Sequence, residues 1–371
     1  MSAPGTILPA FGGRSLEMLF PSIGGALGLP GYANGLGLPS ASHFVVLLID
    51  GLGHDLLRDN AEVAPFLSSL LVDEPMTVGI PSTTATSLTS LGTGLPAGQH
   101  GVVGYTSRVP GTNNRLNTLK WDQPVDPRIW QPHATVLHAM RTAGVEASVV
   151  NDAKFADSGL TLCSQRDVPF HGVNSVWERL DAIVDAVEAS PRAVVYAYES
   201  RLDHTGHAHG TRSTEWRDML TTIDTDVRLL REDLPADTVL VITADHGMVD
   251  LPKGNRFDLD AHKILRQDVV LVAGEARFRH IHTREGAADE VAARWSAKLG
   301  DRAIVRTQDG LEDWFGPIAP EVRPRIGDVV VASLGDFAVF SSADFAIEFK
   351  MTGFHGSVTA AEMQVPFLVS A

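Results

Sequence analysis

The segment ESRLDHTGHAHG, residues 199 to 210, combines an acidic side chain with several histidines. Asp203 and His207 are four residues apart, so in a helix or a tight turn their side chains face the same way. A carboxylate and an imidazole on one face are suited to binding a divalent metal ion. We therefore interpret Asp203 and His207 as candidate metal ligands. His204 and His209 point elsewhere, and we expect them to be ordinary surface or core residues.

Other groups of this kind follow apolar runs that have the length of buried strands. Asp50 follows one run in LLIDGLG, and Asp245 and His246 follow another in VITADHGM. Adjacent residues of a strand point to opposite faces, so Asp245 and His246 reach one site only if the strand has ended, which the following glycine allows. A single acid at a strand end is often only a helix N-cap. In an open α/β sheet, however, the carboxyl ends of the strands form the ligand crevice, where these residues and Asp203 would converge.

A further histidine lies near the end of the chain, where TGFHGS places His355 between two glycines. The set then holds three aspartates and three histidines, which suits two divalent ions, because a catalytic zinc ion takes about three protein ligands and leaves one position open. Nitrogen-rich ligation favours zinc over calcium or magnesium, with manganese or iron as alternatives. Two such ions beside three aspartates keep a net charge of about +1, which would attract a phosphate ester.

Hydroxyl groups for a nucleophile are present in GIPSTTATSLTSLGTGLPAGQHG, residues 79 to 101, directly before a run that is compatible with a helix. A hydroxyl at a helix N-terminus can bind a metal ion as the alkoxide, while the first free backbone N–H groups hold phosphoryl oxygens. The alternative interpretation is an ordinary Ser/Thr capping cluster. The residue types alone leave open which hydroxyl would act.

The elements that must position these residues are apolar runs of strand length that alternate with amphipathic helical stretches. This pattern predicts an α/β fold with a mostly parallel central sheet and helices on both faces. The clearest predicted strands are residues 43–50, 146–152, 193–199 and 238–245, and the predicted helices are residues 135–144, 175–190 and 213–233.

Two stretches interrupt this alternation. Residues 106–132 are rich in turn-forming residues and are predicted to form an inserted cap loop. Residues 253–350 contain strand-like runs around the helical stretch GAADEVAARWSAKLG, which predicts a small inserted α+β lobe. We expect residues 1–371 to form a single α/β catalytic domain that carries both insertions.

The composition limits the classes of function. A chain of 371 residues, 44% of them hydrophobic, can bury a sizeable core, and its net charge of −15 argues against a broad basic surface for nucleic acid or an anionic membrane. The single cysteine, Cys163, excludes an intramolecular disulfide and any multi-cysteine zinc site. We find neither a signal-peptide pattern nor an apolar run of membrane-spanning length, so the cytoplasm is the expected location. The oligomeric state is left open.

Five motifs, taken in order, resemble the alkaline phosphatase superfamily, in particular its nucleotide pyrophosphatase/phosphodiesterase branch. They are VVLLIDGLG, PSTTATSLTSLGTGLPAGQHGVVGY, DHTGHAHG, TADHGM and GFHGS. The resemblance covers most of the chain outside the two insertions and implies an alkaline phosphatase-like fold. Each motif alone is modest, but five in this order are specific.

The resemblance also implies how the ligands divide between the metal ions and which hydroxyl is the nucleophile. One ion would be bound by Asp50, Thr84, Asp245 and His246, and the other by Asp203, His207 and His355. Thr84 would be the catalytic nucleophile. His100 also matches the family pattern, but not as a metal ligand, and we expect it to be structural.

Two positions are expected to contact the substrate. Family phosphodiesterases usually have an Asn three residues after the nucleophile to hold a nonbridging phosphate oxygen, whereas this chain has Ser87, with a shorter side chain and one hydroxyl donor. Tyr105, with Trp121 and Trp130 of the predicted cap, is a candidate for stacking on a nucleotide base, and ordinary packing is the alternative. The expected partner is a nucleotide-like or other small phosphate ester.

These features predict a metal-dependent hydrolase of phosphodiester or pyrophosphate bonds that works through a phosphothreonine intermediate at a two-metal site. A monoester carries about one more negative charge than a diester and would need extra cations, yet residues 76–107 contain no Lys or Arg. Basic residues of the insertions, such as Arg115 and Arg279, could still fold over the site. The alternatives are a phosphomonoesterase, phosphonate hydrolase or phosphomutase of the same superfamily, and a catalytically silent metal- or phosphate-binding protein.

Overall fold

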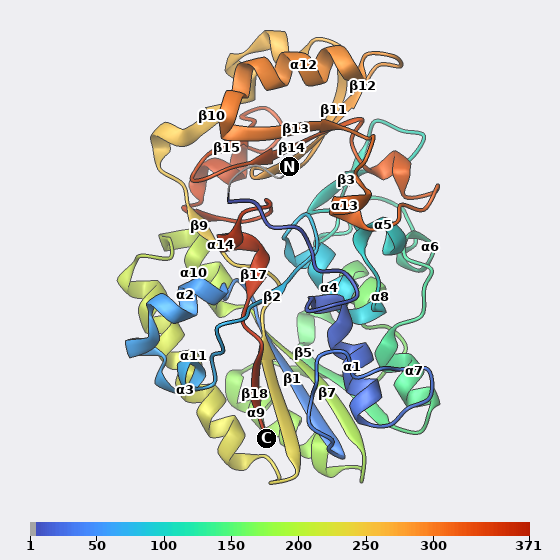
Figure 1. Ribbon diagram of the computed structural model, residues 1–371, viewed down its shortest axis with the longest axis vertical. Helices are drawn as coiled ribbons and strands as arrows, with labels where there is room; N and C mark the ends of the chain where they lie inside the picture. The colour runs from blue at the N-terminus through green and yellow to red at the C-terminus, as the bar shows by residue number, and fades with distance from the viewer. Residues whose placement is uncertain (1–4) are drawn as a thin grey trace.

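The central element of the fold is a sheet that is parallel except at one edge. The computed structural model describes residues 5–371. The strands of the sheet are β1 (His43–Ile49), β5 (Glu146–Asp152), β6 (Phe170–Val173), β7 (Ala193–Glu199), β8 (Thr238–Thr243) and β18 (Leu368–Ser370). Their order is β18-β8-β1-β7-β5-β6, and β18 is antiparallel to β8, whereas the other neighbours pair in parallel. The predicted α/β fold with a mostly parallel sheet is confirmed (Figure 1).

Helices cover both faces of this sheet, which is why its inner strands are buried along their whole length. The helices on one face include α9 (Val176–Glu188) and α11 (Thr214–Asp233), and those on the other include α1 (Leu19–Ala26), α4 (Thr84–Thr93), α7 (Val136–Thr142) and α8 (Gly159–Ser164). Both α9 and α11 begin where the sequence predicts, because Ser175 and Ser213 accept a hydrogen bond from a backbone N–H of the first helical turn.

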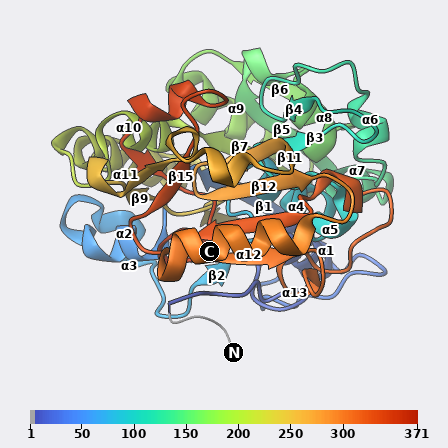
Figure 2. The ribbon, with the colours of Figure 1, turned by 90° about the horizontal axis from the view of Figure 1, so that it is seen from above.

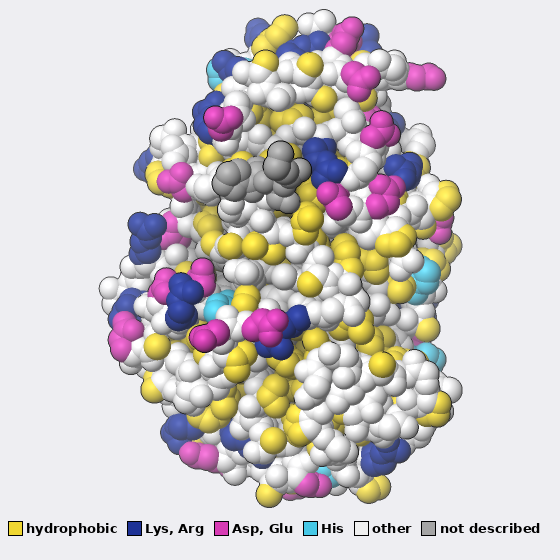
Figure 3. Space-filling model, in the orientation of Figure 1, with side chains coloured by type: hydrophobic (Ala, Val, Ile, Leu, Met, Phe, Trp, Pro, Cys, Tyr) yellow, Lys and Arg dark blue, Asp and Glu magenta, His cyan; other side chains and the backbone are white. Residues whose placement is uncertain are grey.

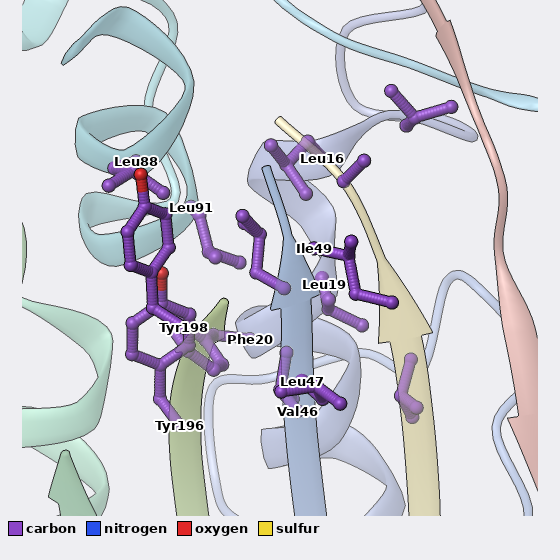
Figure 4. Close-up of a cluster of buried hydrophobic side chains, with 14 of the residues drawn as sticks. Leu16, Leu19, Phe20, Val46, Leu47, Ile49, Leu88, Leu91, Tyr196 and Tyr198 are labelled. Atoms are coloured by element: carbon purple, nitrogen blue, oxygen red, sulfur yellow. The ribbon is translucent and has the colours of Figure 1, made fainter. Parts of the chain in front are cut away.

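The core between the sheet and the helices α1 and α4 fixes the position of α4. Figure 4 shows this core, formed by Leu16, Leu19 and Phe20 in and before α1, Val46, Leu47 and Ile49 of β1, Leu88 and Leu91 of α4, and Tyr196 and Tyr198 of β7. Leu88 and Leu91 are almost completely buried. The first residue of α4, Thr84, is therefore held by packed side chains rather than by a mobile loop.

A second, antiparallel sheet is formed within residues 253–350. Its strands are β11 (Val269–Glu275), β12 (Phe278–Thr283), β13 (Ala303–Thr307) and β14 (Val329–Ser333), in the order β11-β12-β14-β13. The helix α12 (Ala288–Leu299) lies on its outer side, and Trp295 of this helix packs into a separate apolar cluster with Val272 and Ile281. Figure 1 shows this sheet and α12 at one end of the molecule, and Figure 2 looks down onto that end.

Shorter elements surround the two sheets. The predicted cap contains a hairpin of β3 (Thr106–Arg108) and β4 (Arg115–Asn117), followed by α6 (Pro127–Trp130). The others that matter below are α5 (Ala97–His100), β9 (Val249–Asp250), α10 (Arg201–His209), β16 (Gly353–Phe354) and α14 (Ala360–Met363). Within residues 5–371, every helix is too short or too polar to cross a membrane. On the face drawn in Figure 3, basic and acidic side chains are interspersed.

Candidate metal centre and active site

The predicted metal ligands meet at the carboxyl ends of β1, β7 and β8. Asp50 directly follows β1, Asp245 and His246 follow β8, and Asp203 and His207 lie on α10, directly after β7. The sixth residue, His355, follows β16, and β16 pairs with β9, which continues the chain beyond His246. The residues form two groups, each with ligand atoms within 4.8 Å of one another: Asp50, Asp245 and His246 in one, and Asp203, His207 and His355 in the other.

In the first group, His246 faces two carboxylates. Its Nε2 atom lies 3.3 Å from Oδ1 of Asp50 and 3.5 Å from Oδ2 of Asp245. The remaining oxygens of these carboxylates are held by the protein: Asp50 Oδ2 accepts a hydrogen bond from the Tyr198 hydroxyl, and Asp245 Oδ1 accepts one from the Gly51 N–H at 3.2 Å. Each aspartate is thus oriented by one oxygen and presents the other.

In the second group, two histidines share one carboxylate. Oδ1 of Asp203 lies 3.4 Å from Nε2 of His207 and 3.9 Å from Nε2 of His355. The two groups are adjacent, because the rings of His246 and His355 stack with their centroids 3.5 Å apart. The geometry therefore describes one centre with two ligand groups rather than two separate sites.

All three histidines have the same orientation of hydrogen bonds. Nδ1 of His207, His246 and His355 faces a backbone carbonyl, of Gly353, Gly247 and Ser82 respectively, at 2.8, 2.9 and 3.1 Å. A carbonyl can only accept, so Nδ1 carries the proton and Nε2 of the neutral ring keeps its lone pair for a metal ion. This is the usual arrangement of metal-binding histidines, in which the second nitrogen donates to the protein.

The carboxylate oxygens opposite these nitrogens lack any other partner. Within residues 5–371, Oδ1 of Asp50, Oδ1 of Asp203 and Oδ2 of Asp245 are buried and have no hydrogen-bond donor. Burial, together with repulsion from the other two aspartates, raises the pKa of Asp50 well above its usual value. Burial also raises the pKa of Asp245, against the attraction of His246. A cation between these oxygens removes both penalties, so the donor set fits metal ions.

The hydroxyl of Thr84 lies against this centre. Its Oγ1 atom is 3.2 Å from Nε2 of His246. The neighbouring hydroxyls are directed elsewhere: Ser82 donates to the Ser357 carbonyl, Thr83 to the Glu275 carboxylate and Thr86 to the Val102 carbonyl. The fold thus places one hydroxyl of this segment at the metal ligands, at the N-terminus of α4.

A family comparison covers the part of the chain that contains the whole centre. Residues 44–357 match the family model of type I phosphodiesterase / nucleotide pyrophosphatase, and this range includes both ligand groups and Thr84. The chain belongs to this family. It is therefore an enzyme of the hydrolase class, and the resemblance read from the five motifs is confirmed. A comparison of the sequence with curated proteins gave no match.

Several solved structures have the same fold as this chain, at low sequence identity. Murine ectonucleotide pyrophosphatase/phosphodiesterase 5 superposes with a TM-score of 0.72 and 22% identity over 88% of this chain and 87% of that chain. An inactive variant of the murine protein in complex with AMP gives a TM-score of 0.71 at 20% identity, and the human protein gives 0.69 at 20%, both with the same coverage. At these identities the likeness concerns the fold.

A cavity of about 360 Å³ opens beside the centre of this phosphodiesterase-family chain. Thr84, Asp50, Asp203, His207 and His355 lie along one part of it. Other parts of the wall are apolar and contain Leu88, Leu119, Phe155, Leu160, Ile347 and Met351. The volume of the cavity is within the range of small-molecule binding pockets.

The described residues that line the cavity contain no lysine or arginine. The two basic residues of the insertions named above, Arg115 and Arg279, pair with acids instead. Arg115 forms an ion pair with Asp344 at 2.9 Å, and Arg279 forms one with Glu348 and is itself buried. The positive charge of this site would thus come from the metal ions.

The residues predicted to contact substrate differ in their positions. Tyr105 lines the cavity. Ser87 is fully buried and its hydroxyl donates to the Asp245 carbonyl at 2.6 Å, so it supports the end of β8, and its contact with phosphate stays a prediction. Trp121 and Trp130 pack edge to face with ring centroids 6.4 Å apart, and Trp130 also stacks on the Arg325 guanidinium. These contacts agree with the alternative that both tryptophans serve ordinary packing.

The predicted bystander histidines take part in local hydrogen bonds. Nδ1 of His204 faces the Ser200 carbonyl one helical turn earlier, at 2.8 Å, and His209 is exposed beside Glu215. His100 is fully buried, its Nδ1 accepts from the Val102 N–H, and burial lowers its pKa to about 3. His100 is thus a buried, neutral residue held by local hydrogen bonds, which agrees with a structural role.

Sequence reasoning missed two residues of the site. Tyr198, which donates to Asp50, lies inside the apolar run of β7 and gives no signal of its own. Glu275, the last residue of β11, lines the cavity, and burial raises its pKa to about 8. No motif surrounds Glu275, because the second sheet brings it to the site from far along the chain.

Proposed function

We propose that this chain hydrolyses phosphodiester or pyrophosphate bonds at a two-metal site, with Thr84 as the nucleophile. The observation that carries the proposal is the 3.2 Å contact of the Thr84 hydroxyl with Nε2 of His246, at the edge of a cavity that also holds the second ligand group. A hydroxyl placed at metal ligands and at a helix N-terminus has the environment of an activated nucleophile.

The residues present would hold two divalent ions. Asp50, Thr84, Asp245 and His246 would hold one, and Asp203, His207 and His355 the other. The three imidazoles favour zinc, with manganese or iron as alternatives. When bound, the ions would supply Lewis-acid stabilisation of the negative charge that develops on phosphorus and its oxygens.

The reaction then takes two displacements at phosphorus. Oγ1 of Thr84 forms a bond to phosphorus while the bond to the leaving oxygen breaks, and the leaving alcohol or phosphate takes a proton. The phosphothreonine intermediate keeps the other substituent of the phosphoryl group; water then attacks its phosphorus, the bond to Oγ1 of Thr84 breaks, a proton of the water returns to Oγ1, and a phosphate monoester leaves. The first backbone N–H groups of α4, which begins at Thr84, would donate hydrogen bonds to the phosphoryl oxygens.

The charge of the cavity supports a diester over a monoester. Two divalent ions and three aspartates leave a charge of about +1, which matches one phosphodiester anion. No cationic side chain among the described lining residues is present to balance a second negative charge, and the carboxyl groups of Glu275 and Glu348 also line the cavity. A phosphomonoester dianion would therefore be bound less well.

The shape of the cavity supports a nucleotide-like substrate. Tyr105 and the apolar wall offer flat and hydrophobic surfaces next to Thr84, which suit the stacking of a base or another ring. A structural neighbour is described in complex with AMP, which supports a nucleotide-like substrate for this chain. We propose a nucleotide-like or other small ester with an uncharged substituent.

A matched assay tests this function. Bis-p-nitrophenyl phosphate, p-nitrophenyl phosphate and a nucleoside diphosphate sugar are compared in the presence of zinc or manganese. We expect a higher kcat/KM for the diester than for the monoester. A preference for the monoester of about tenfold or more, about 1.4 kcal/mol of transition-state stabilisation, would identify a phosphomonoesterase. Absence of turnover on all three substrates would contradict the enzymatic proposal.

A further inference from the structure

The helix α4, which carries Thr84, begins without a side-chain cap, although a threonine precedes it. Thr83 occupies the N-cap position of α4 with an extended backbone, but its side chain makes no capping hydrogen bond within the described chain. Threonine at this position usually accepts a hydrogen bond from a backbone N–H of the first turn. Thr135, at the start of α7, does so by accepting from the His138 N–H. Thr359, at the start of α14, makes no such bond either, and its hydroxyl donates to the Glu362 carboxyl group instead.

The Thr83 hydroxyl is held by a residue of the second sheet. It donates to Oε2 of Glu275 at 3.1 Å, and both side chains are buried. Glu275 ends β11 at the tight turn to β12, and its neighbour Gly274 has a φ of +83°. The turn is tied to the cap hairpin by the Thr106 hydroxyl, which donates to the Gly274 carbonyl at 2.8 Å.

The Glu275 carboxyl group is also packed against the loop that carries His355. A Cβ atom added to Gly356 would lie 2.8 Å from the carboxyl carbon of Glu275. This close approach leaves the carboxyl group little room to move. Glu275 therefore offers Thr83 a fixed acceptor.

The consequence concerns the first backbone donors of α4. The Ser87 N–H donates to the Thr83 carbonyl at 3.0 Å, so the N–H groups of Thr84, Ala85 and Thr86 precede the first helical hydrogen bond. They lie at the end of the helix where the Thr84 hydroxyl meets His246. A Thr83 hydroxyl that turned toward them would occupy one of these donors and compete with a phosphoryl oxygen for it.

We propose that Glu275 is a positioning residue of the phosphate site. An oxygen of its carboxyl group holds the Thr83 hydroxyl away from the N-terminus of α4 and keeps the first N–H groups available for phosphoryl oxygens. The second sheet thereby contributes directly to the active site. This inference rests on the proposed function, because it assumes that the N-terminus of α4 binds the phosphoryl group.

The test is the dissociation constant of inorganic phosphate, measured by calorimetry on full-length protein whose metal content has been matched by elemental analysis. In Glu275→Ala the Thr83 hydroxyl is free to cap α4. We expect phosphate to bind about fivefold more weakly, the factor that corresponds to an N-cap of about 1 kcal/mol. An unchanged dissociation constant would overturn the proposal.

A second substitution separates this role from a general loss of structure. Valine cannot accept a hydrogen bond, so adding Thr83→Val to Glu275→Ala removes the competing cap, and we expect phosphate affinity to return toward that of the parent protein. A double variant that binds phosphate as weakly as Glu275→Ala would contradict the competition. A structural defect alone would not be repaired by a second substitution at Thr83.

Two controls complete the experiment. Glu275→Gln keeps an oxygen that accepts the hydrogen bond from Thr83, and we expect this variant to bind phosphate more tightly than Glu275→Ala. Equal weakening in both variants would show that the acid group, not the acceptor oxygen, matters, and would overturn the proposal. Glu285→Ala removes an exposed carboxylate of the same lobe and should bind phosphate like the parent. Turnover of bis-p-nitrophenyl phosphate by the parent is measured alongside; if it is absent, the proposed function fails first, which distinguishes the two failures.

Discussion

The Thr84 hydroxyl lies 3.2 Å from Nε2 of His246, although the two residues are 162 positions apart in the sequence. Each is placed by a different part of the core. The leucines of α4 pack against the central sheet and hold Thr84 at the helix N-terminus, and His246 follows the buried strand β8. The candidate nucleophile and the candidate metal ligand are therefore positioned by rigid elements, as precise catalysis requires.

Metal content is the first prediction. We expect elemental analysis after dialysis against zinc to give about two ions per chain, because two groups of three ligands converge. His207→Ala should reduce this to about one, since the group of Asp50, Asp245 and His246 keeps its ligands. The matched control is His209→Ala, which removes a half-exposed histidine two residues away and should leave both ions.

Two results would contradict this description of the centre. One is a stoichiometry that stays below one ion per chain in the parent protein. The other is an equal loss in His207→Ala and His209→Ala, which would mean that the geometry of His207 with Asp203 and His355 has no part in binding.

A buried ion pair makes the second prediction. Arg277, next to β12, donates from Nε to Glu362 of α14 at 3.0 Å and forms a second bond from its terminal nitrogen, and both side chains are fully buried. Arg277→Met leaves the Glu362 charge buried without its cationic partner, with the Ser357 N–H and the Thr359 hydroxyl as remaining donors. We expect urea unfolding to show a loss of about 3–5 kcal/mol. Adding Glu362→Gln should recover part of this loss.

An exposed pair of the same kind provides the control for Arg277. Arg228 and Glu232 are one turn apart on α11, and their side chains are 46% and 56% exposed. Because water screens such pairs, Arg228→Met should change the free energy of unfolding by less than about 1 kcal/mol. Similar losses in both variants would contradict the importance assigned to burial.

The accuracy of the sequence-based fold depended on burial. The strands β5 and β7 occupy the predicted ranges 146–152 and 193–199, because inner strands of a covered parallel sheet are continuous apolar runs. The edge strand β6 was missed because its His171 and Gly172 are exposed, so no apolar run marks it. The other edge strand, β18, has only three residues and pairs with β8 in the antiparallel direction.

The site could be predicted where its chemistry follows a strand. All six candidate ligands stand in motifs, and each lies within three residues after a strand or on the helix that follows one. Glu275 stands 192 residues from Thr83, its hydrogen-bond partner, and is delivered by the turn of a second sheet. Local sequence carries no information about that long-range contact, and only the packing of the two sheets reveals it.

A pH dependence of stability is the third prediction. His280 is fully buried, its Nδ1 accepts from the Gly327 N–H at 3.1 Å, and its Nε2 donates to the Val103 carbonyl at 2.9 Å. Burial lowers its pKa to about 4. The unfolded chain takes up this proton near pH 6.5, so the free energy of unfolding falls as the pH falls from about 6.5 to about 4, by up to about 1.4 kcal/mol per pH unit from this group.

Comparison with a variant that does not titrate isolates His280 from the other histidines. His100 and His282, whose pKa values burial lowers to about 3, act in the same direction in both proteins. His280→Gln should therefore lose stability less steeply between pH 6.5 and 4 than the parent, as measured by urea unfolding at several pH values. Equal slopes would show that His280 does not remain neutral in the folded protein.

The role of Thr84 is the fourth prediction and the centre of the account. Thr84→Ala removes the hydroxyl beside His246. Thr86→Val, on the same helix, removes a buried hydroxyl that donates to the Val102 carbonyl. Both variants keep the apolar residues that anchor α4. Comparing them separates loss of the nucleophile from disturbance of the helix.

The most direct measurement is kcat/KM for bis-p-nitrophenyl phosphate in the parent, Thr84→Ala and Thr86→Val, with the metal content of each sample determined. We predict that Thr84→Ala loses at least about a thousandfold of the parent activity, as expected when a covalent nucleophile is removed, while Thr86→Val stays within about tenfold. Activity of Thr84→Ala within about tenfold of the parent at equal metal content would contradict the account.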